Sequence, residues 1–431
     1  MVGDFCQRNS QSSTDGASQT EIEALQAVKV RDPDIVERAH IAAKAYHTIR
    51  RYFAHAEGLP AEYDFEARYR AYLQAAISAE DRRAFSLASM RLFASLRNGH
   101  TSFVDDQLRE EMGPRPFMIR LIEGQWTVVW TRITALSPGD VIAGIDGKSV
   151  AEWFDPVYDY IGKSHSVVLD FSLWRFADVL PKVFTLRMDD GRQILIDLTA
   201  ATDGQAHGRF PANDVDIIRR DDGLVVIKVP AFDDPKYEQS AISAIRDATD
   251  AKAVLLDLRG NRGGSTPVNL LAAIMMTPYQ GTMFTSPMTI ACNDAAGSHE
   301  SSGPDFTHLA MRYGPYTIQP LPNAWKGKIA VLADNYCGSA GEDFVLRFQQ
   351  GGRGLVLGET TWGSTGQPYF VGFPEFGMSF RVSTKREYFA NGTPFEGVGV
   401  TPDRVIPLTR EELRSGVDAQ LEEAAKIALM L

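Results

Sequence analysis

The chain has 431 residues, of which 44% are hydrophobic and 23% charged, the composition of a folded protein with room for two or three domains. Its net charge of −11 argues against nucleic acid as the main partner, because phosphate binding needs a concentrated basic face. Three scattered cysteines are too few for a disulfide framework or a zinc site, so no metal or cofactor is expected. No apolar run approaches the ~18 residues of a membrane helix, so no transmembrane segment is expected.

Residues 1–20 are rich in Ser, Gln, Thr and Gly, which predicts a disordered tail. The first residues lack the basic and apolar regions of a signal peptide. The chain as written is therefore expected in the cytoplasm, or in the periplasm or outside the cell if a signal peptide has been removed.

Residues 21–113 carry apolar side chains at spacings of three and four, which predicts a helical region. The region ends in the sequence LRNGHT. The Asn-Gly pair at 98–99 is a good helix stop, and His100 is left at the junction with a short strand. Helix positions on the surface or half-buried are expected for three other histidines, His40, His47 and His55.

Residues 114–203 change to strand-like alternation with turn signals. The Ser-Pro-Gly-Asp turn at 137–140 and the Asp-Gly hairpin at 146–147 resemble a segment of PDZ domains. Such modules hold an extended peptide as an added strand, often by its C-terminal carboxylate. We therefore expect a PDZ-like β domain here, and a small β domain without a ligand is the alternative.

Residues 210–410 alternate between strand and helix patterns, which predicts an α/β domain. The nearly continuous apolar run at 253–258 is typical of a parallel strand buried on both faces. Residues 285–325 are rich in Gly, Pro and Ser, which predicts a long loop over the site. A C-terminal helix is expected for residues 411–431.

One serine lies where chemistry is expected, because a buried strand at 329–334 runs into a small-residue turn that opens a helix at Ser339. A serine at such a turn is raised on the sheet edge, near helix N–H groups that stabilise an anion, although serine is also a common helix cap. The glycine-rich loop at 257–265 follows another strand and can also aim N–H groups at an anion. It lacks the Walker lysine and the Rossmann spacing, which favours an oxyanion hole or a tight turn over phosphate binding.

Taken together, the motifs resemble peptidase family S41, which comprises the C-terminal (tail-specific) processing proteases and the tricorn-type core. Six motifs occur in the order that the family has, at residues 96–101, 137–140, 257–264, 339–342, 358–363 and 395–403. The resemblance implies a crotonase-like (ClpP/crotonase) αββ-superhelix core in the α/β domain, preceded by the helical region and the PDZ-like domain.

The resemblance also implies site residues. In the processing-protease branch, the segment matching 358–365 carries a lysine base, but Ser364 stands at that position here. The tricorn-like branch uses a histidine matching His100 and a glutamate matching Glu396. This implies Ser339 as nucleophile, His100 as general base and Glu396 as the residue that orients the histidine. The oxyanion hole would be formed by N–H groups of Gly263 or Gly264 and of Ala340.

The expected function is that of a serine-type peptidase that hydrolyses peptide bonds through an acyl-enzyme. Its partner would be a polypeptide, with a C-terminal tail held by the PDZ-like domain. One alternative is a catalytically inactive relative that binds peptides or hydrophobic ligands. Another is a crotonase-type acyl transferase, which is disfavoured because the sequence has no basic nucleotide-binding patch. The Ser298-His299-Glu300 cluster is expected on the surface, and the sequence leaves the oligomeric state open.

Overall fold

The computed structural model describes residues 30–111, 116–164, 179–200, 204–208, 213–288 and 309–431. The tail predicted for residues 1–20 and the cluster at 298–300 lie outside them. Within the described part of the chain, no helix is long and apolar enough to cross a bilayer.

The N-terminal region contains three main helices, α2 (Ile35–Tyr52), α3 (Phe65–Ser78) and α4 (Arg82–Ala94). An aspartate precedes each helix and accepts a hydrogen bond from the backbone of the first turn, which satisfies an N–H group that has no partner within the helix. A short 3₁₀ turn, η1 (Ala56–Gly58), joins the first two, and α5 (Asp106–Glu111) follows the third.

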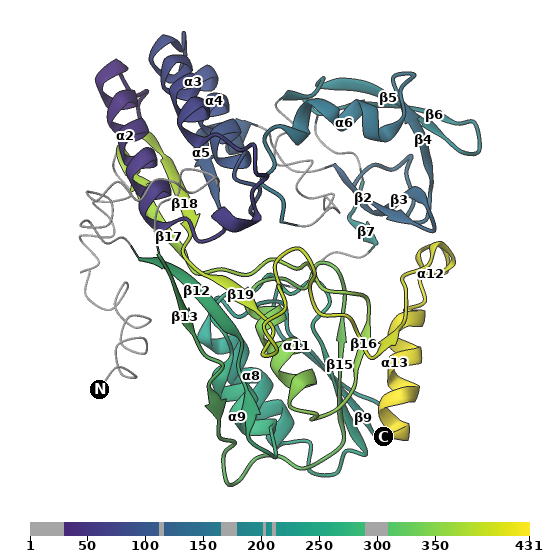
Figure 1. The fold of residues 1–431 in the computed structure, drawn as a ribbon. Helices are drawn as coiled ribbons and strands as arrows, with labels where there is room; N and C mark the ends of the chain where they lie inside the picture. Colours follow the sequence, from purple (N-terminus) through teal and green to yellow (C-terminus); the bar gives the residue numbers. More distant parts are fainter. Residues whose placement is uncertain (1–29, 112–115, 165–178, 201–203, 209–212, 289–308) are drawn as a thin grey trace.

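These helices pack on a sheet that contains strands from the opposite end of the chain. The strand β1 (Ser102–Asp105) pairs antiparallel with β18 (Met378–Ser383), which also pairs with β17 (Pro368–Phe373). Figure 1 shows β17 and β18 against α2, and one hydrophobic core joins the helices to these strands. The N-terminal and C-terminal parts are therefore one packed unit around the loop that carries His100.

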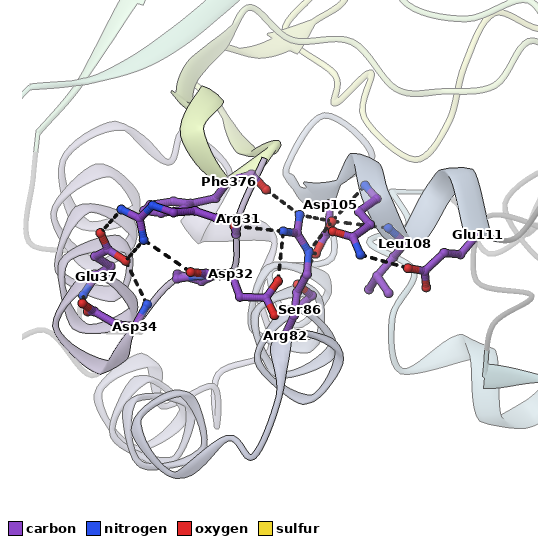
Figure 2. A network of polar contacts seen from close by, with 12 residues as sticks. Arg31, Asp32, Asp34, Glu37, Arg82, Ser86, Asp105, Leu108, Glu111 and Phe376 are labelled. Carbon is purple, nitrogen blue, oxygen red and sulfur yellow. Dashed lines mark hydrogen bonds and ion pairs between the residues drawn. The ribbon is translucent and has the colours of Figure 1, made fainter. Parts of the chain in front are cut away.

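A buried ion pair fixes the far end of β1 (Figure 2). The guanidinium of Arg82 pairs with the carboxylate of Asp105 at 2.7 Å and also donates to the carbonyl of Phe376. Arg82 is 5% exposed and Asp105 fully buried, and the Ser86 hydroxyl donates to the same carboxylate. Because both charges have hydrogen-bonding partners, the ion pair is tolerated in the core. It links α4, β1 and the turn before β18.

The middle of the chain is rich in β-structure. The strands β2 (Phe117–Ile122) and β3 (Gln125–Thr131) form one sheet with β7 (His207–Gly208). A second sheet contains β4 (Ile142–Ile145), β5 (Val183–Met188) and β6 (Gln193–Asp197), and α6 (Val150–Tyr158) contributes to the core that both sheets share. The Asp-Gly pair at 146–147 has positive φ at both residues, as a tight hairpin turn requires.

The last part is a mixed α/β fold, as predicted. Five strands of its six-stranded sheet are parallel: β9 (Leu224–Lys228), β10 (Ala253–Asp257), β15 (Ile329–Ala333), β16 (Val356–Gly358) and β20 (Arg404–Val405). The edge strand β8 (Asp216–Arg219) is antiparallel. Alternate residues of the strands face two cores. One core contains α8 (Pro235–Arg246), α9 (Val268–Ile274) and α11 (Ala340–Gln350), and the other contains α13 (Ala419–Met430).

The loop predicted at 285–325 is wrong for the residues that the structure describes. It contains part of β12 (Met283–Met288), together with β13 (Leu309–Tyr313) and β14 (Thr317–Ile318). The strand β14 pairs with β11 (Tyr279–Gln280), and β12 pairs with both β13 and β19 (Arg386–Tyr388). Pairing with a strand about 100 residues later supplies backbone partners that local composition does not reveal.

Two smaller expectations also differ. The C-terminal segment forms two helices, because Gly416 ends α12 (Arg410–Ser415) in a left-handed conformation before α13 begins. His55 is only 4% exposed, and its Nε2 lies 3.0 Å from both the Ser383 hydroxyl and the Lys385 carbonyl.

Candidate active site

Ser339 lies at the N-terminus of α11, after the turn that follows β15. Its φ of 55° and ψ of −122° are rarely adopted by a residue with a side chain, so the surrounding contacts must hold this strained conformation. A Cβ added to Gly263 would lie 2.6 Å from the Ser339 Cβ, so only glycine fits opposite the serine. The turn is tied down by Asp334, whose carboxylate accepts from the N–H groups of Gly260, Tyr336 and Cys337.

His100 lies in the loop between α4 and β1, directly beside this serine. Its Nε2 is 3.1 Å from the Ser339 Oγ, although the two residues are 239 positions apart. The imidazole is 6% exposed, and burial, with the charge of Arg381 second, lowers its pKa to about 3. At neutral pH the ring is therefore uncharged, so one of its nitrogens can accept a proton.

The other nitrogen of His100 contacts a serine, not Glu396. Nδ1 lies 3.0 Å from the Ser364 Oγ, and that hydroxyl is 3.2 Å from the Glu396 Oε1. The sequence led us to expect a direct contact between Glu396 and the histidine, but in the structure the Ser364 hydroxyl lies between them. The sequence had marked Ser364 only as the position where relatives carry lysine. A hydroxyl there can accept from the imidazole and donate to the carboxylate, which sequence reasoning did not consider.

Glu396 is held by several donors. Its Oε1 accepts from the Asn98 side-chain amide at 2.8 Å, and its Oε2 accepts from the Thr365 backbone N–H at 3.2 Å. Burial raises the pKa of the Glu396 carboxyl to about 7, against the opposite effect of these hydrogen bonds. The carboxyl group therefore changes its charge near neutral pH.

A second glutamate, Glu342, connects the two serine-bearing segments. Its carboxylate is fully buried and accepts from the backbone N–H groups of Ser339, Gly363 and Ser364 and from the Thr361 hydroxyl. Burial raises its pKa to about 8. The sequence indicated only an acidic residue in the first helical turn, since the segment it binds lies about 20 residues further along the chain.

The backbone N–H groups expected at the oxyanion hole are not equivalent. The Gly263 N–H already donates to the Asn261 side-chain oxygen at 2.9 Å, so it is not free to bind an anion. Neither the Gly264 N–H nor the Ala340 N–H donates to a residue that the structure describes. Gly264 has a φ of 134° and lies against Phe232, which fixes the direction of its peptide group. Of the three residues expected, Gly264 and Ala340 retain a free donor.

The described part of the chain shows no metal site beside this cluster. Among the described residues, no group of three or more His, Cys, Asp or Glu side chains could hold an ion.

Residues 223–406, which carry Ser339 and Glu396 but not His100, match the model of peptidase family S41. This part of the chain is therefore similar to the peptidases of family S41. Among curated proteins, the tricorn protease of Thermoplasma acidophilum is 31% identical over 123 residues, and that of Thermoplasma volcanium is also 31% identical over 123 residues. These matches cover 25% and 26% of this chain but only 10% and 11% of those proteins.

Solved structures resemble the chain over most of its length. Mature CPAF is 14% identical with a TM-score of 0.67, over 91% of this chain and 97% of that chain. The tricorn protease structure is 16% identical with a TM-score of 0.50, over 92% of this chain and 37% of that chain. At such identities the likeness concerns the fold alone, and it includes the helical and β-rich parts outside residues 223–406.

Proposed function

We propose that this chain is a serine-type peptidase that hydrolyses polypeptides through an acyl-enzyme. The observation that supports this most directly is the 3.1 Å contact between the Ser339 Oγ and the Nε2 of an uncharged, buried His100. A serine hydroxyl is a weak nucleophile until a neighbouring base takes its proton. The match of residues 223–406 to a peptidase family makes the peptide bond the expected target.

The first chemical step is attack of Ser339 on the peptide carbonyl. As the Oγ–C bond forms, the hydroxyl proton passes to His100 Nε2, and the carbonyl π electrons move onto oxygen. The Ala340 N–H at the start of α11, together with the Gly264 N–H, stabilises the resulting oxyanion, aided by the positive end of the helix dipole. Collapse breaks the C–N bond, and the imidazolium returns the proton to the leaving amine. Water then hydrolyses the acyl-enzyme by the same route.

The imidazolium is stabilised through a hydroxyl. The His100 Nδ1–H donates to the Ser364 Oγ, whose own O–H donates to Glu396. Glu396 acts through Ser364, so we propose a relay of Ser339, His100, Ser364 and Glu396. The carboxylate both fixes the tautomer that leaves Nε2 able to accept and offsets the positive charge that develops on the ring.

We further propose that residues 210–410 form a crotonase-like catalytic core and that residues 114–203 form a PDZ-like domain that holds a substrate tail. Two contacts between the domains support a role close to catalysis. Arg120 of β2 pairs with Glu359 at 3.0 Å and lies 5.1 Å from the centroid of the Tyr336 ring. Tyr336 precedes Ser339 by three residues and Glu359 precedes Ser364 by five, so the β-rich part contacts both serine-bearing segments.

The test combines a fluorophosphonate probe, which acylates activated serines, with cleavage of unfolded polypeptide. We expect the wild type to be labelled and to cleave, and Ser339→Ala and His100→Ala to do neither while remaining folded. The exposed His47 provides a matched control, and His47→Ala should behave as the wild type. A folded wild type that binds peptides but shows neither labelling nor cleavage would refute the peptidase and support the inactive binding protein instead.

A further inference from the structure

The segment that follows α6 lies between the two loops that carry His100 and Glu396. A Cβ added to Gly162 would be 2.8 Å from the Asn98 carbonyl and 3.1 Å from that of Thr101. A Cβ added to Gly397 would be 2.8 Å from the Ser164 carbonyl. Real Cβ atoms do not approach backbone so closely, so glycine at 162 and 397 lets three stretches of backbone meet here. The contact is therefore built into the fold.

Ser164 uses this contact to bind the relay. Its Oγ accepts from the Gly99 N–H at 2.9 Å, immediately before His100. The same oxygen lies 3.1 Å from the Ser364 Oγ, and the Ser164 side chain lowers the pKa of the neighbouring Glu396 carboxyl. The hydroxyl thus contacts the segments that hold the base, the intermediate hydroxyl and the carboxylate.

The direction of the protons follows from the acceptors. Because the Ser164 Oγ accepts from a backbone N–H, its own proton is free to be donated, and a carboxylate is the strongest acceptor nearby. The Ser364 proton is likewise directed to Glu396 by its acceptance of the His100 Nδ1–H. The Ser164 hydroxyl can therefore donate to the Ser364 Oγ or to the Glu396 carboxylate, while the Ser364 hydroxyl donates to Glu396.

We propose that Ser164 is a positioning residue of the peptidase, which orients Ser364 beside Glu396 and fixes the His100 loop. The inference rests on the proposed function. The Ser164 hydroxyl contacts the Gly99 N–H and the Ser364 Oγ and not the Ser339 Oγ, so it acts through Ser364 and Glu396.

The charge of Glu396 provides a readout that a purely structural serine would not move. Two charged side chains, Glu342 and Arg386, act on this carboxyl, and His100 is connected to it by way of the Ser364 hydroxyl. Among the hydrogen bonds that lower its pKa, the one from Ser164 is the largest. Loss of the Ser164 hydroxyl would therefore raise the pKa of Glu396, and more alkaline solution would be needed to ionise it.

The experiment measures the rate of fluorophosphonate labelling and of peptide cleavage against pH for the wild type, Ser164→Ala and Ser164→Thr. Removing a hydrogen bond to a charged group is expected to lower kcat about 10-fold. We expect Ser164→Ala to show that loss at pH 7, with KM unchanged and the acid limb of the profile moved to higher pH. Ser164→Thr keeps the hydroxyl and should restore most of the rate.

The matched control is Ser89, a buried serine of α4 whose hydroxyl bonds to the Phe85 carbonyl and the Tyr72 hydroxyl and not to a relay residue. Ser89→Ala removes a hydroxyl of the same kind and should leave the pH profile unchanged. If Ser164→Ala keeps the wild-type acid limb and loses no more rate than Ser89→Ala, the positioning role is wrong. Thermal melts of every variant show whether a lost rate reflects lost fold.

A second measurement separates this inference from the peptidase proposal. The imidazole signals of His100, assigned with His100→Gln, are followed by NMR during a pH titration of the wild type and Ser164→Ala. If the wild type is not labelled by the probe, the peptidase proposal fails. A changed titration of His100 in Ser164→Ala would still support the positioning role, and identical titrations in the two proteins would overturn it.

Discussion

Replacing Ser364 by alanine tests whether the relay runs through a hydroxyl. The change removes the group 3.0 Å from His100 Nδ1 and 3.2 Å from Glu396 Oε1 and puts only a methyl group in its place. The His100 N–H then has no acceptor in a site that is only 6% exposed. A buried donor left without a partner costs about 1–3 kcal/mol. Since about 1.4 kcal/mol corresponds to tenfold in rate, kcat should fall about 5- to 150-fold.

The same reasoning predicts the activity of a double variant. If Ser364 and Glu396 act in series, Ser364→Ala combined with Glu396→Gln should lose little more than the worse single variant, because the second change breaks a chain that is already broken. The assay is kcat on a peptide substrate, with Ser364→Thr as the variant that retains a hydroxyl. A Ser364→Ala enzyme within twofold of the wild type, or fully additive losses in the double variant, would refute the relay.

Three further predictions follow from other features. Burial raises the pKa of Glu396 to about 7 and lowers that of His100 to about 3. The kcat/KM of the wild type should therefore fall as the pH drops through about 7, because the Glu396 carboxylate is then protonated. Glu396→Gln should give a low kcat/KM that does not change with pH in this range. Arg82→Met leaves Asp105 charged and buried and should lower the free energy of unfolding in urea by about 3–5 kcal/mol. Gly263→Ala should abolish labelling of Ser339, because the added methyl would lie 2.6 Å from the serine Cβ and the φ of 77° disfavours a side chain.

The controls for these changes come from the same chain. Arg109 forms an exposed pair with Asp106, and Arg109→Ala should cost no more than about 1 kcal/mol. Gly372 has open space where its Cβ would be, so Gly372→Ala should leave labelling intact. An acid limb that survives in Glu396→Gln, a stability loss below 1 kcal/mol for Arg82→Met, or full labelling of Gly263→Ala would each contradict its prediction.

Much of the fold was readable from local patterns. The apolar run that became β10 and the small-residue turn after β15 follow from side-chain periodicity and turn chemistry, which depend on neighbours in sequence. The contact between Ser339 and His100 was expected only because the order of motifs resembles a known family. The strands β12, β13 and β14 were missed, because the pairing of β12 with β19 joins residues about 100 positions apart.

The features of the candidate site that the sequence did not predict were missed for one physical reason. Ser364 and Ser164 are common residues whose significance lies in what their hydroxyls reach across the fold, and no spacing rule reports such distances. The role of Glu342 was hidden in the same way, since its backbone partners lie beyond the helix it begins. Gly263 was expected as a donor, but its N–H is occupied by the Asn261 side chain, which only the folded geometry reveals.

The pairing of β1 with β18 also governs when the chain can become reactive during its synthesis. Ribosomes make the His100 loop early, but its antiparallel partner and the Glu396 loop emerge almost 300 residues later. Until then, β1 lacks the strand that pairs with it beside the His100 loop. A nascent chain therefore carries Ser339 without His100 in place, and the proposed peptidase would become active only after nearly all of this fold has formed.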